Sequence, residues 1–125
     1  GASNDNKINK EVNSLEQSIN LKVNNLMNKA DMIETYFILK DAKLFIGSDS
    51  SNMHISVAAK IPTVALFGIS NDKVYGPKGK NDLVIRGSKS YDEIKSEESL
   101  NIRDDKFYIK DITVQKVLNE IRIII

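Results

Sequence analysis

Hydrophobic residues recur every three to four positions along four stretches of the chain, which is the spacing of one face of an α-helix. These stretches predict helices over residues 6–18, 29–41, 51–60 and 113–124. The last helix begins at Thr113, a residue type that suits an N-cap. Pro62 stops the third helix, because proline lacks a backbone donor and its predecessor avoids helical dihedral angles.

Short apolar runs separate the predicted helices. Residues 44–46 and 63–67 each end at a glycine and are typical of strands buried on both faces of a parallel sheet. Residues 82–86 predict a third strand, and the alternation in residues 19–23 predicts a short half-exposed one. Strands that alternate with helices imply right-handed crossovers. The expected fold class is α/β, a three-layer Rossmann-like parallel sheet.

The region from residue 88 to residue 105 shows little periodicity. It is acidic, and we interpret it as a solvated excursion from the sheet. Its acidic residues are Asp92, Glu93, Glu97, Glu98, Asp104 and Asp105.

Composition and charge exclude several function classes. With 125 residues, 41% hydrophobic and 28% charged, the chain has the size and apolar content of one domain. A formal charge of +1 is too balanced for nucleic acid binding through bulk charge. The absence of cysteine excludes disulfides and thiolate metal sites, and it is compatible with a reducing cytoplasm. The longest apolar stretch, residues 61–69, is too short to span a membrane.

Residues 47–54 form the first candidate loop, Gly-Ser-Asp-Ser-Ser-Asn-Met-His, between a predicted strand and the start of a helix. In open α/β sheets, ligands bind at this edge, and free amides at a helix N-terminus favour phosphate. The alternative is that Asp49 or Ser50 merely caps the helix. His54 is the only histidine, and it either fills space or donates a hydrogen bond to an oxyanion held by those amides. One histidine without cysteine predicts no metal site, and we expect no cofactor.

The second candidate loop, residues 68–80, follows the next strand and carries Lys73, Lys78 and Lys80 against Asp72. It either steers an anion toward the site or is an ordinary solvated loop. The dinucleotide fingerprint, the Walker phosphate loop and a nucleophile elbow are all absent from the sequence.

Residues 45–54, Phe-Ile-Gly-Ser-Asp-Ser-Ser-Asn-Met-His, and 58–68, Ala-Ala-Lys-Ile-Pro-Thr-Val-Ala-Leu-Phe-Gly, are followed by the turn Tyr75-Gly76-Pro77. In order, spacing and residue types this chain resembles the family 9 glycosyltransferases, the lipopolysaccharide heptosyltransferases and their relatives. Weaker similarity extends to residues 25–26, 29–34 and 112–114. The family has Gly-Pro where this chain has Ser51-Asn52, which leaves open an altered backbone approach to phosphate and a different donor.

The resemblance implies that residues 1–125 form a single nucleotide-sugar-binding domain, most of the C-terminal half of a GT-B glycosyltransferase. It implies that Asp49 contacts the donor sugar, that the backbone at Ser50 and Ser51 holds the diphosphate and that His54 lies beside it. It also places Asp5 in a loop after a strand, as a contact to the ribose. Alternatively, residues 1–3 are cloning residues, which would weaken the assignment of Asp5.

The resemblance implies an inverting enzyme that transfers a sugar from a nucleotide-diphosphate sugar, with ADP-heptose as the expected donor, to a growing lipopolysaccharide core. The family's catalytic base and acceptor cleft belong to the N-terminal half, so we expect this chain alone to be inactive. The given sequence starts at Gly1, and we expect it to be an excised domain without a leader of its own. The expected location of the full-length protein is the cytoplasm, either free or peripheral at the inner membrane. The alternative is a non-catalytic α/β module that binds nucleotides or partners.

Overall fold

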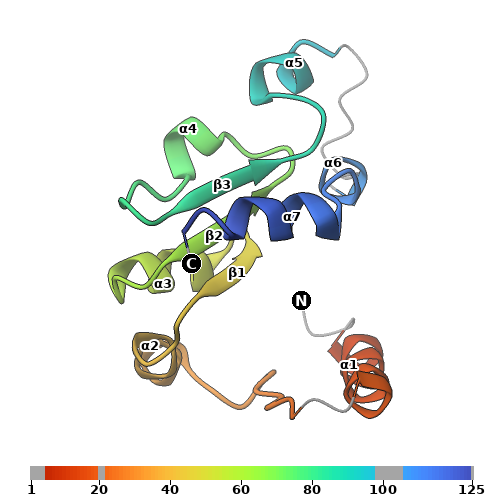
Figure 1. Ribbon diagram of the computed structural model, residues 1–125, viewed down its shortest axis with the longest axis vertical. Coiled ribbons are helices and arrows are strands. Elements are labelled where there is room, and N and C mark those ends of the chain that lie inside the picture. Colours follow the sequence, from red (N-terminus) through yellow and green to blue (C-terminus); the bar gives the residue numbers. More distant parts are fainter. Residues whose placement is uncertain (1–4, 20–21, 98–105, 125) are drawn as a thin grey trace. The chain divides into compact units, whose positions relative to one another are not determined.

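The computed structural model describes residues 5–19, 22–97 and 106–124 (Figure 1). Contacts divide the chain into two compact units, Gly1–Glu34 and Thr35–Ile125, with the boundary inside helix α2 (Met32–Lys40). The assignment of the chain to a single nucleotide-sugar-binding domain stays a prediction.

The first unit contains helix α1 (Asp5–Ile19), which confirms the helix expected over residues 6–18. The prediction of a strand over residues 19–23 is wrong for the residues that the structure describes. Ile19 is the last residue of α1, and Lys22 and Val23 have no regular structure. Residues 20–21 lie outside the described part. A strand requires a neighbour for its backbone groups, and the described sheet pairs none with this segment.

Helix α2 begins at Met32, three residues later than expected, because a capping box defines its start. The Glu34 amide donates to Asp31 Oδ1 at 2.8 Å, and the Asp31 amide donates to Glu34 Oε2 at 2.9 Å. This reciprocal pair satisfies two of the backbone donors that a helix N-terminus leaves open.

The second unit is built on a parallel sheet of three strands, β1 (Phe45–Ser48), β2 (Thr63–Phe67) and β3 (Leu83–Arg86), in the order β1-β2-β3. Gly47 pairs with Ala65 and Leu66 with Ile85. The expectation of an α/β fold with parallel strands is therefore confirmed. The central strand β2 is buried along nearly its whole length, as its apolar run predicts.

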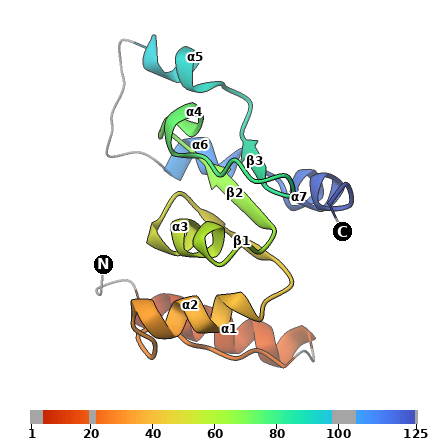
Figure 2. The ribbon, with the colours of Figure 1, turned by 90° about the vertical axis from the view of Figure 1, so that its left-hand side faces the viewer.

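Helices cover the two faces of this sheet (Figure 2). On one face, helix α3 (Ser51–Ala58) packs Met53 against Ala65 and Phe67. On the other, helix α7 (Val114–Ile121) packs Ile121 against alternate residues of β2 and β3. Successive strand residues point to opposite faces, so one apolar run supplies both cores. The Thr113 side chain accepts from the Lys116 amide and confirms the expected N-cap.

A buried pair of hydroxyls fixes α3 to the sheet. Ser56 Oγ donates to the Met53 carbonyl at 2.7 Å and lies 2.9 Å from Thr63 Oγ1. Both side chains are fully buried, and Thr63 also donates to the Ile61 carbonyl. Buried hydroxyls need such partners, and this pair holds α3 at a defined height above β2.

Two other expectations about the second unit need correction. Strand β1 is not buried on both faces, since Ile46 is 48% exposed; among the residues that the structure describes, β1 is an edge strand, with a hydrogen-bonded neighbour on one side only. The acidic region is also not wholly irregular, because it contains helix α5 (Tyr91–Lys95) with Ile94 buried. Two short helices complete the unit, α4 (Asp72–Tyr75) and α6 (Lys106–Lys110).

Candidate functional site

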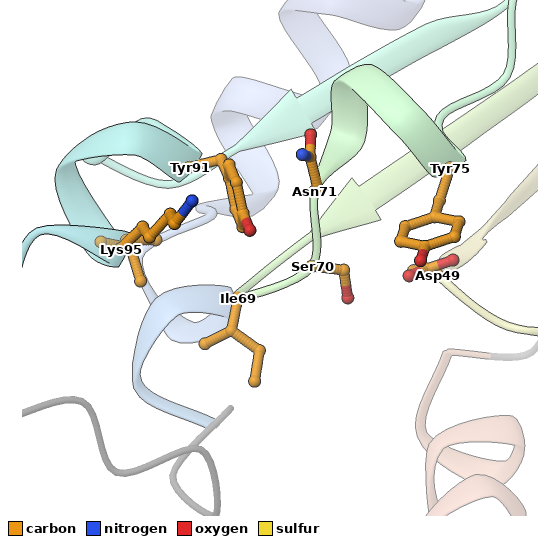
Figure 3. A pocket seen from close by; sticks show the side chains of 8 residues that line it. Asp49, Ile69, Ser70, Asn71, Tyr75, Tyr91 and Lys95 are labelled. Carbon is orange, nitrogen blue, oxygen red and sulfur yellow. The ribbon is translucent and has the colours of Figure 1, made fainter.

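A cavity of about 440 Å³ lies at the carboxyl ends of the three parallel strands (Figure 3). Each strand contributes to its wall through the segment that follows it: Asp49 after β1, residues 69–71 and α4 after β2, and α5 after β3. This is the edge at which α/β sheets bind ligands. The lining residues are Asp49, Ile69, Ser70, Asn71, Tyr75, Tyr91, Ile94 and Lys95.

Asp49 is the predicted site residue that lines the cavity itself. Its side chain is 22% exposed, and its Oδ1 lies 3.9 Å from Nε2 of His54, whose side chain is 57% exposed. At this distance the two groups are near each other without a hydrogen bond. The structure therefore places Asp49 and His54 close together on the β1–α3 loop and at the start of α3. Both side chains are partly exposed to solvent.

Ser50 and Ser51 lie between these two residues in the chain, at the start of α3. Ser50 is the N-cap residue by position, but its side chain makes no capping hydrogen bond. The side chains of Asn71, Ser90 and Thr113 do cap the helices that follow them. Plain side-chain capping by Ser50, one of the two alternatives for this loop, is therefore not what the structure has.

The second candidate loop supplies a wall of the cavity through Ile69, Ser70, Asn71 and Tyr75. The Asn71 side chain accepts from the Lys73 amide at 3.0 Å, which starts α4 and carries Tyr75 to the cavity. Gly76 ends this helix where a Cβ would collide with the Asp72 carbonyl oxygen. The Tyr-Gly-Pro turn thus has a local structural reason, since only glycine fits this close approach.

The lysines of this loop lie in different surroundings, and steering of an anion by them stays a prediction. Lys73 Nζ lies 2.6 Å from Asp92 Oδ2, and their hydrogen bond raises the pKa of Lys73 and lowers that of Asp92. Lys80 precedes β3 and borders a different cavity, of about 250 Å³, which also contains Pro62 just before β2. It therefore lies at the amino ends of parallel strands. The lysine that lines the 440 Å³ cavity is Lys95.

Sequence reasoning missed the α5 wall, formed by Tyr91, Ile94 and Lys95. In the view of Figure 3, Tyr91 and Lys95 lie on one side of the cavity, and Tyr75 and Asp49 on the other. A signal was present in the spacing Ser90-x-x-Glu93, because these residues form a capping box that starts α5. The Ser90 hydroxyl and amide donate hydrogen bonds to the Glu93 carboxylate, and these bonds lower the pKa of Glu93.

Polar contacts also hold the end of α5. Glu97 accepts hydrogen bonds from Lys89 and from the Tyr108 hydroxyl, the latter at 2.9 Å. These bonds lower the pKa of Glu97 and raise that of Tyr108. The α5 wall is therefore attached to α6, which carries Tyr108.

Asp5 is described as a helix residue and not as a loop residue, and residues 1–4 before it lie outside the described part. It is the first residue of α1, whose apolar stripe already begins at Ile8. Its side chain is outside the described part, so the contact to a ribose stays a prediction. Within the described residues, no cluster of histidine, aspartate or glutamate side chains could hold a metal ion, and no helix is long and apolar enough to cross a membrane.

Comparison with known proteins identifies the family. The chain is 41% identical over 58 residues to lipooligosaccharide heptosyltransferase 2 of Campylobacter jejuni subsp. jejuni serotype O:6 (strain 81116 / NCTC 11828), a match that covers 46% of this chain and 18% of that protein. No solved structure matches. The model of glycosyltransferase family 9 (heptosyltransferase) matches residues 1–102 and so includes the whole Asp49 loop and the cavity. The chain therefore belongs to glycosyltransferase family 9.

Proposed function

We propose that this chain binds the nucleotide-diphosphate-sugar donor of an inverting heptosyltransferase of lipopolysaccharide core biosynthesis, with ADP-heptose as the donor. One observation carries the proposal: the carboxylate of Asp49 lines a cavity of about 440 Å³ directly beside the start of α3, where Ser50 forms no side-chain cap. Family membership makes a sugar nucleotide the expected ligand for that combination.

The sugar is assigned to the cavity. Its volume falls within the range of about 300–1,000 Å³ that is usual for small-molecule sites. Asp49 offers acceptor oxygens for sugar hydroxyls, and Tyr75, Tyr91 and Ile94 offer apolar surface for the ring faces. A carboxylate that accepts from hydroxyl groups makes stronger hydrogen bonds than a neutral acceptor, which suits selection of a sugar conjugate over the bare nucleotide.

The diphosphate is assigned to the start of α3. Within the described residues the amide N–H of Ser51 has no hydrogen-bond partner, because it precedes the first helical repeat. Such amides and the positive end of the helix stabilise negative charge, and that charge increases on the diphosphate as the glycosidic bond breaks. His54 lies one turn further along α3, and we assign it as a second donor to the same oxygens.

The reaction itself needs groups that this chain is not proposed to supply. Direct displacement requires a base that deprotonates the acceptor hydroxyl while the diphosphate departs. The matched relative is much longer than the matched segment, which covers 18% of it. We assign the base and the lipopolysaccharide acceptor site to the remaining part of such an enzyme, in the cytoplasm or at the inner face of the membrane.

Isothermal titration calorimetry tests the proposal. The chain is titrated with ADP, UDP, ADP-heptose and UDP-glucose, and ADP-heptose is expected to bind more tightly than ADP. A preference for UDP-glucose over UDP instead would keep the donor-binding role and contradict the assigned donor. Each titration is repeated with Asp41→Asn, which removes a carboxylate charge from an exposed residue outside the cavity. This variant should give the same dissociation constants as the unsubstituted chain. Binding of nucleotides without preference for any conjugate would favour a plain nucleotide-binding module and contradict the proposal.

A further inference from the structure

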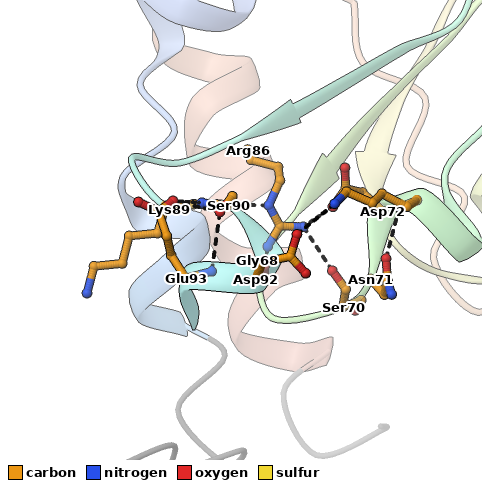
Figure 4. A network of polar contacts seen from close by, with 10 residues as sticks. Gly68, Ser70, Asn71, Asp72, Arg86, Lys89, Ser90, Asp92 and Glu93 are labelled. Atoms are coloured by element: carbon orange, nitrogen blue, oxygen red, sulfur yellow. Dashed lines mark hydrogen bonds and ion pairs between the residues drawn. The ribbon is translucent and has the colours of Figure 1, made fainter. Parts of the chain in front are cut away.

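One arginine joins two walls of the cavity without lining it. Arg86, the last residue of β3, has a side chain only 12% exposed. Its Nη1 donates to the Ser70 carbonyl and to Asp72 Oδ1, each at 2.8 Å, and its Nη2 donates to the Gly68 carbonyl. Its Nε donates to the Lys89 carbonyl at 3.4 Å. Figure 4 shows the guanidinium group between these acceptors.

The acceptors belong to two different segments. Gly68, Ser70 and Asp72 enclose the loop that presents Ile69 and Asn71 to the cavity. Lys89 lies just before α5, which presents Tyr91 and Lys95 from the other side. A shift of either segment would change the width of the cavity, and Arg86 is bonded to both.

Another link between these segments lies at the surface. Lys73 and Asp92 join α4 to α5, but their side chains are 69% and 67% exposed, and such ion pairs contribute little and are screened by salt. Arg86 and Asp72 are 12% and 21% exposed, so their charged hydrogen bonds form in a less polar surrounding and are stronger. Arg86 is therefore held firmly on the loop side and reaches the α5 segment through one bond of 3.4 Å to the Lys89 carbonyl.

We propose that Arg86 is a positioning residue for the sugar-binding half of the cavity. It holds the loop at residues 68–72 and the start of α5 at the separation that a sugar ring requires, while the diphosphate contacts on the β1–α3 loop do not depend on it. The inference rests on the proposed function, and it deepens that function by assigning sugar affinity to a residue that never touches the sugar.

The shape of the guanidinium group explains why an arginine is needed. Of its five N–H groups, the four described bonds use four, which point in different directions within one plane. A lysine carries three donors on one nitrogen and cannot reach both segments together. Arg86→Lys therefore keeps the charge next to Asp72 and removes the bridge.

Two measurements on Arg86→Lys test the inference, and Arg122→Lys is the matched control because Arg122 is exposed on the far end of α7. The first measurement is amide hydrogen exchange, in which peptides from residues 68–72 and 89–97 should exchange faster together. Peptides from α7 should be unchanged. Loosening of the whole unit at once would show a merely structural role and overturn the inference.

The second measurement compares affinities by calorimetry at a temperature where both variants are folded. In Arg86→Lys the preferred sugar conjugate should bind about tenfold more weakly, as expected when one charged hydrogen bond no longer supports the site. The bare nucleotide should bind within about twofold of the original affinity. An equal loss for both ligands, or no loss for either, would overturn the inference while the proposed function stands.

The two proposals fail in distinguishable ways. If the unsubstituted chain binds no sugar conjugate better than its nucleotide, the proposed function is wrong and the sugar role of Arg86 falls with it. If the unsubstituted chain shows the preference and Arg86→Lys retains it fully, only the inference about Arg86 is wrong.

Discussion

Replacing Asp49 by asparagine is expected to separate the proposed sugar binding from the proposed diphosphate binding. The substitution keeps the size of the side chain and removes its charge. In the described residues the Asp49 carboxylate accepts no hydrogen bond, and its Oδ1 lies 3.9 Å from Nε2 of His54. Its oxygens are therefore available to sugar hydroxyls, and the change to asparagine should not disturb an existing network.

The expected loss follows from the charge that the substitution removes. A hydrogen bond to a charged group contributes about 1.5–3 kcal/mol, and the asparagine side chain still offers a neutral acceptor oxygen, so the loss falls in the lower part of that range. We expect the sugar conjugate to lose about 1.5–2 kcal/mol, or about 10- to 30-fold in affinity. The bare nucleotide should bind equally well or better, because a negative charge near its diphosphate is gone.

Calorimetry with a nucleotide and its sugar conjugate measures both quantities, after thermal melting has shown that Asp49→Asn is folded. Asp41→Asn serves as the control, since it removes the same charge from an exposed residue outside the cavity. Equal weakening of nucleotide and conjugate would refute the sugar contact and show that Asp49 acts on the loop as a whole.

Three further predictions concern the start of α3, the core and the α5 wall. Ser51→Pro removes one amide N–H at the first helical position, where proline is tolerated. Bare nucleotide binding should weaken by about 1.5–3 kcal/mol while the melting temperature stays the same. Unaltered binding would show that this amide does not contact the diphosphate. Phe67→Ala empties a fully buried position and should cost about 3–5 kcal/mol in urea unfolding, against a much smaller cost for Phe37→Ala, which is 59% exposed; equal costs would contradict the assigned core. Lys73 and Lys89 hold the pKa values of Asp92 and Glu97 below their ordinary values of 3.8 and 4.5. These contacts therefore stabilise α5 fully at pH values above the ordinary pKa values, and the stabilisation is lost as the pH falls through the lowered pKa values. Amide protection of α5, corrected for intrinsic exchange, should then fall in acid before that of α7, and parallel loss in both helices would count against the argument.

The sheet and its flanking helices could be predicted from the sequence because their signals are local and strong. The apolar run at residues 63–67 predicts a central buried strand, and this is what β2 is. Pro62 ends the preceding helix region, and Thr113 marks the start of α7. The exposure of Ile46 could not be predicted, because the number of neighbours beside β1 is a property of the sheet and not of the run.

The site was predictable on one side only. Asp49 follows a recognisable strand and precedes a recognisable helix, so its place at the carboxyl edge follows from the topology. Tyr91 and Lys95 lie in an acidic segment without periodicity, on a helix of five residues. Such a helix is too short to show an amphipathic pattern, and only its capping box carries a local signal.

The two sides of the cavity also differ in how they are held, and this bears on specificity. The β1–α3 loop is fixed through the core, by the buried Met53 side chain of α3 and by the hydrogen-bonded pair of Ser56 and Thr63. The α5 wall has Ile94 as its buried anchor and is otherwise tied by polar contacts of Lys89, Asp92 and Glu97, one of which comes from Arg86. A diphosphate is common to all nucleotide sugars and suits a rigid loop, whereas the sugar differs from donor to donor. Because polar links can be exchanged without emptying a core, the α5 wall is the part of this fold in which sugar preference can change at the smallest cost in stability.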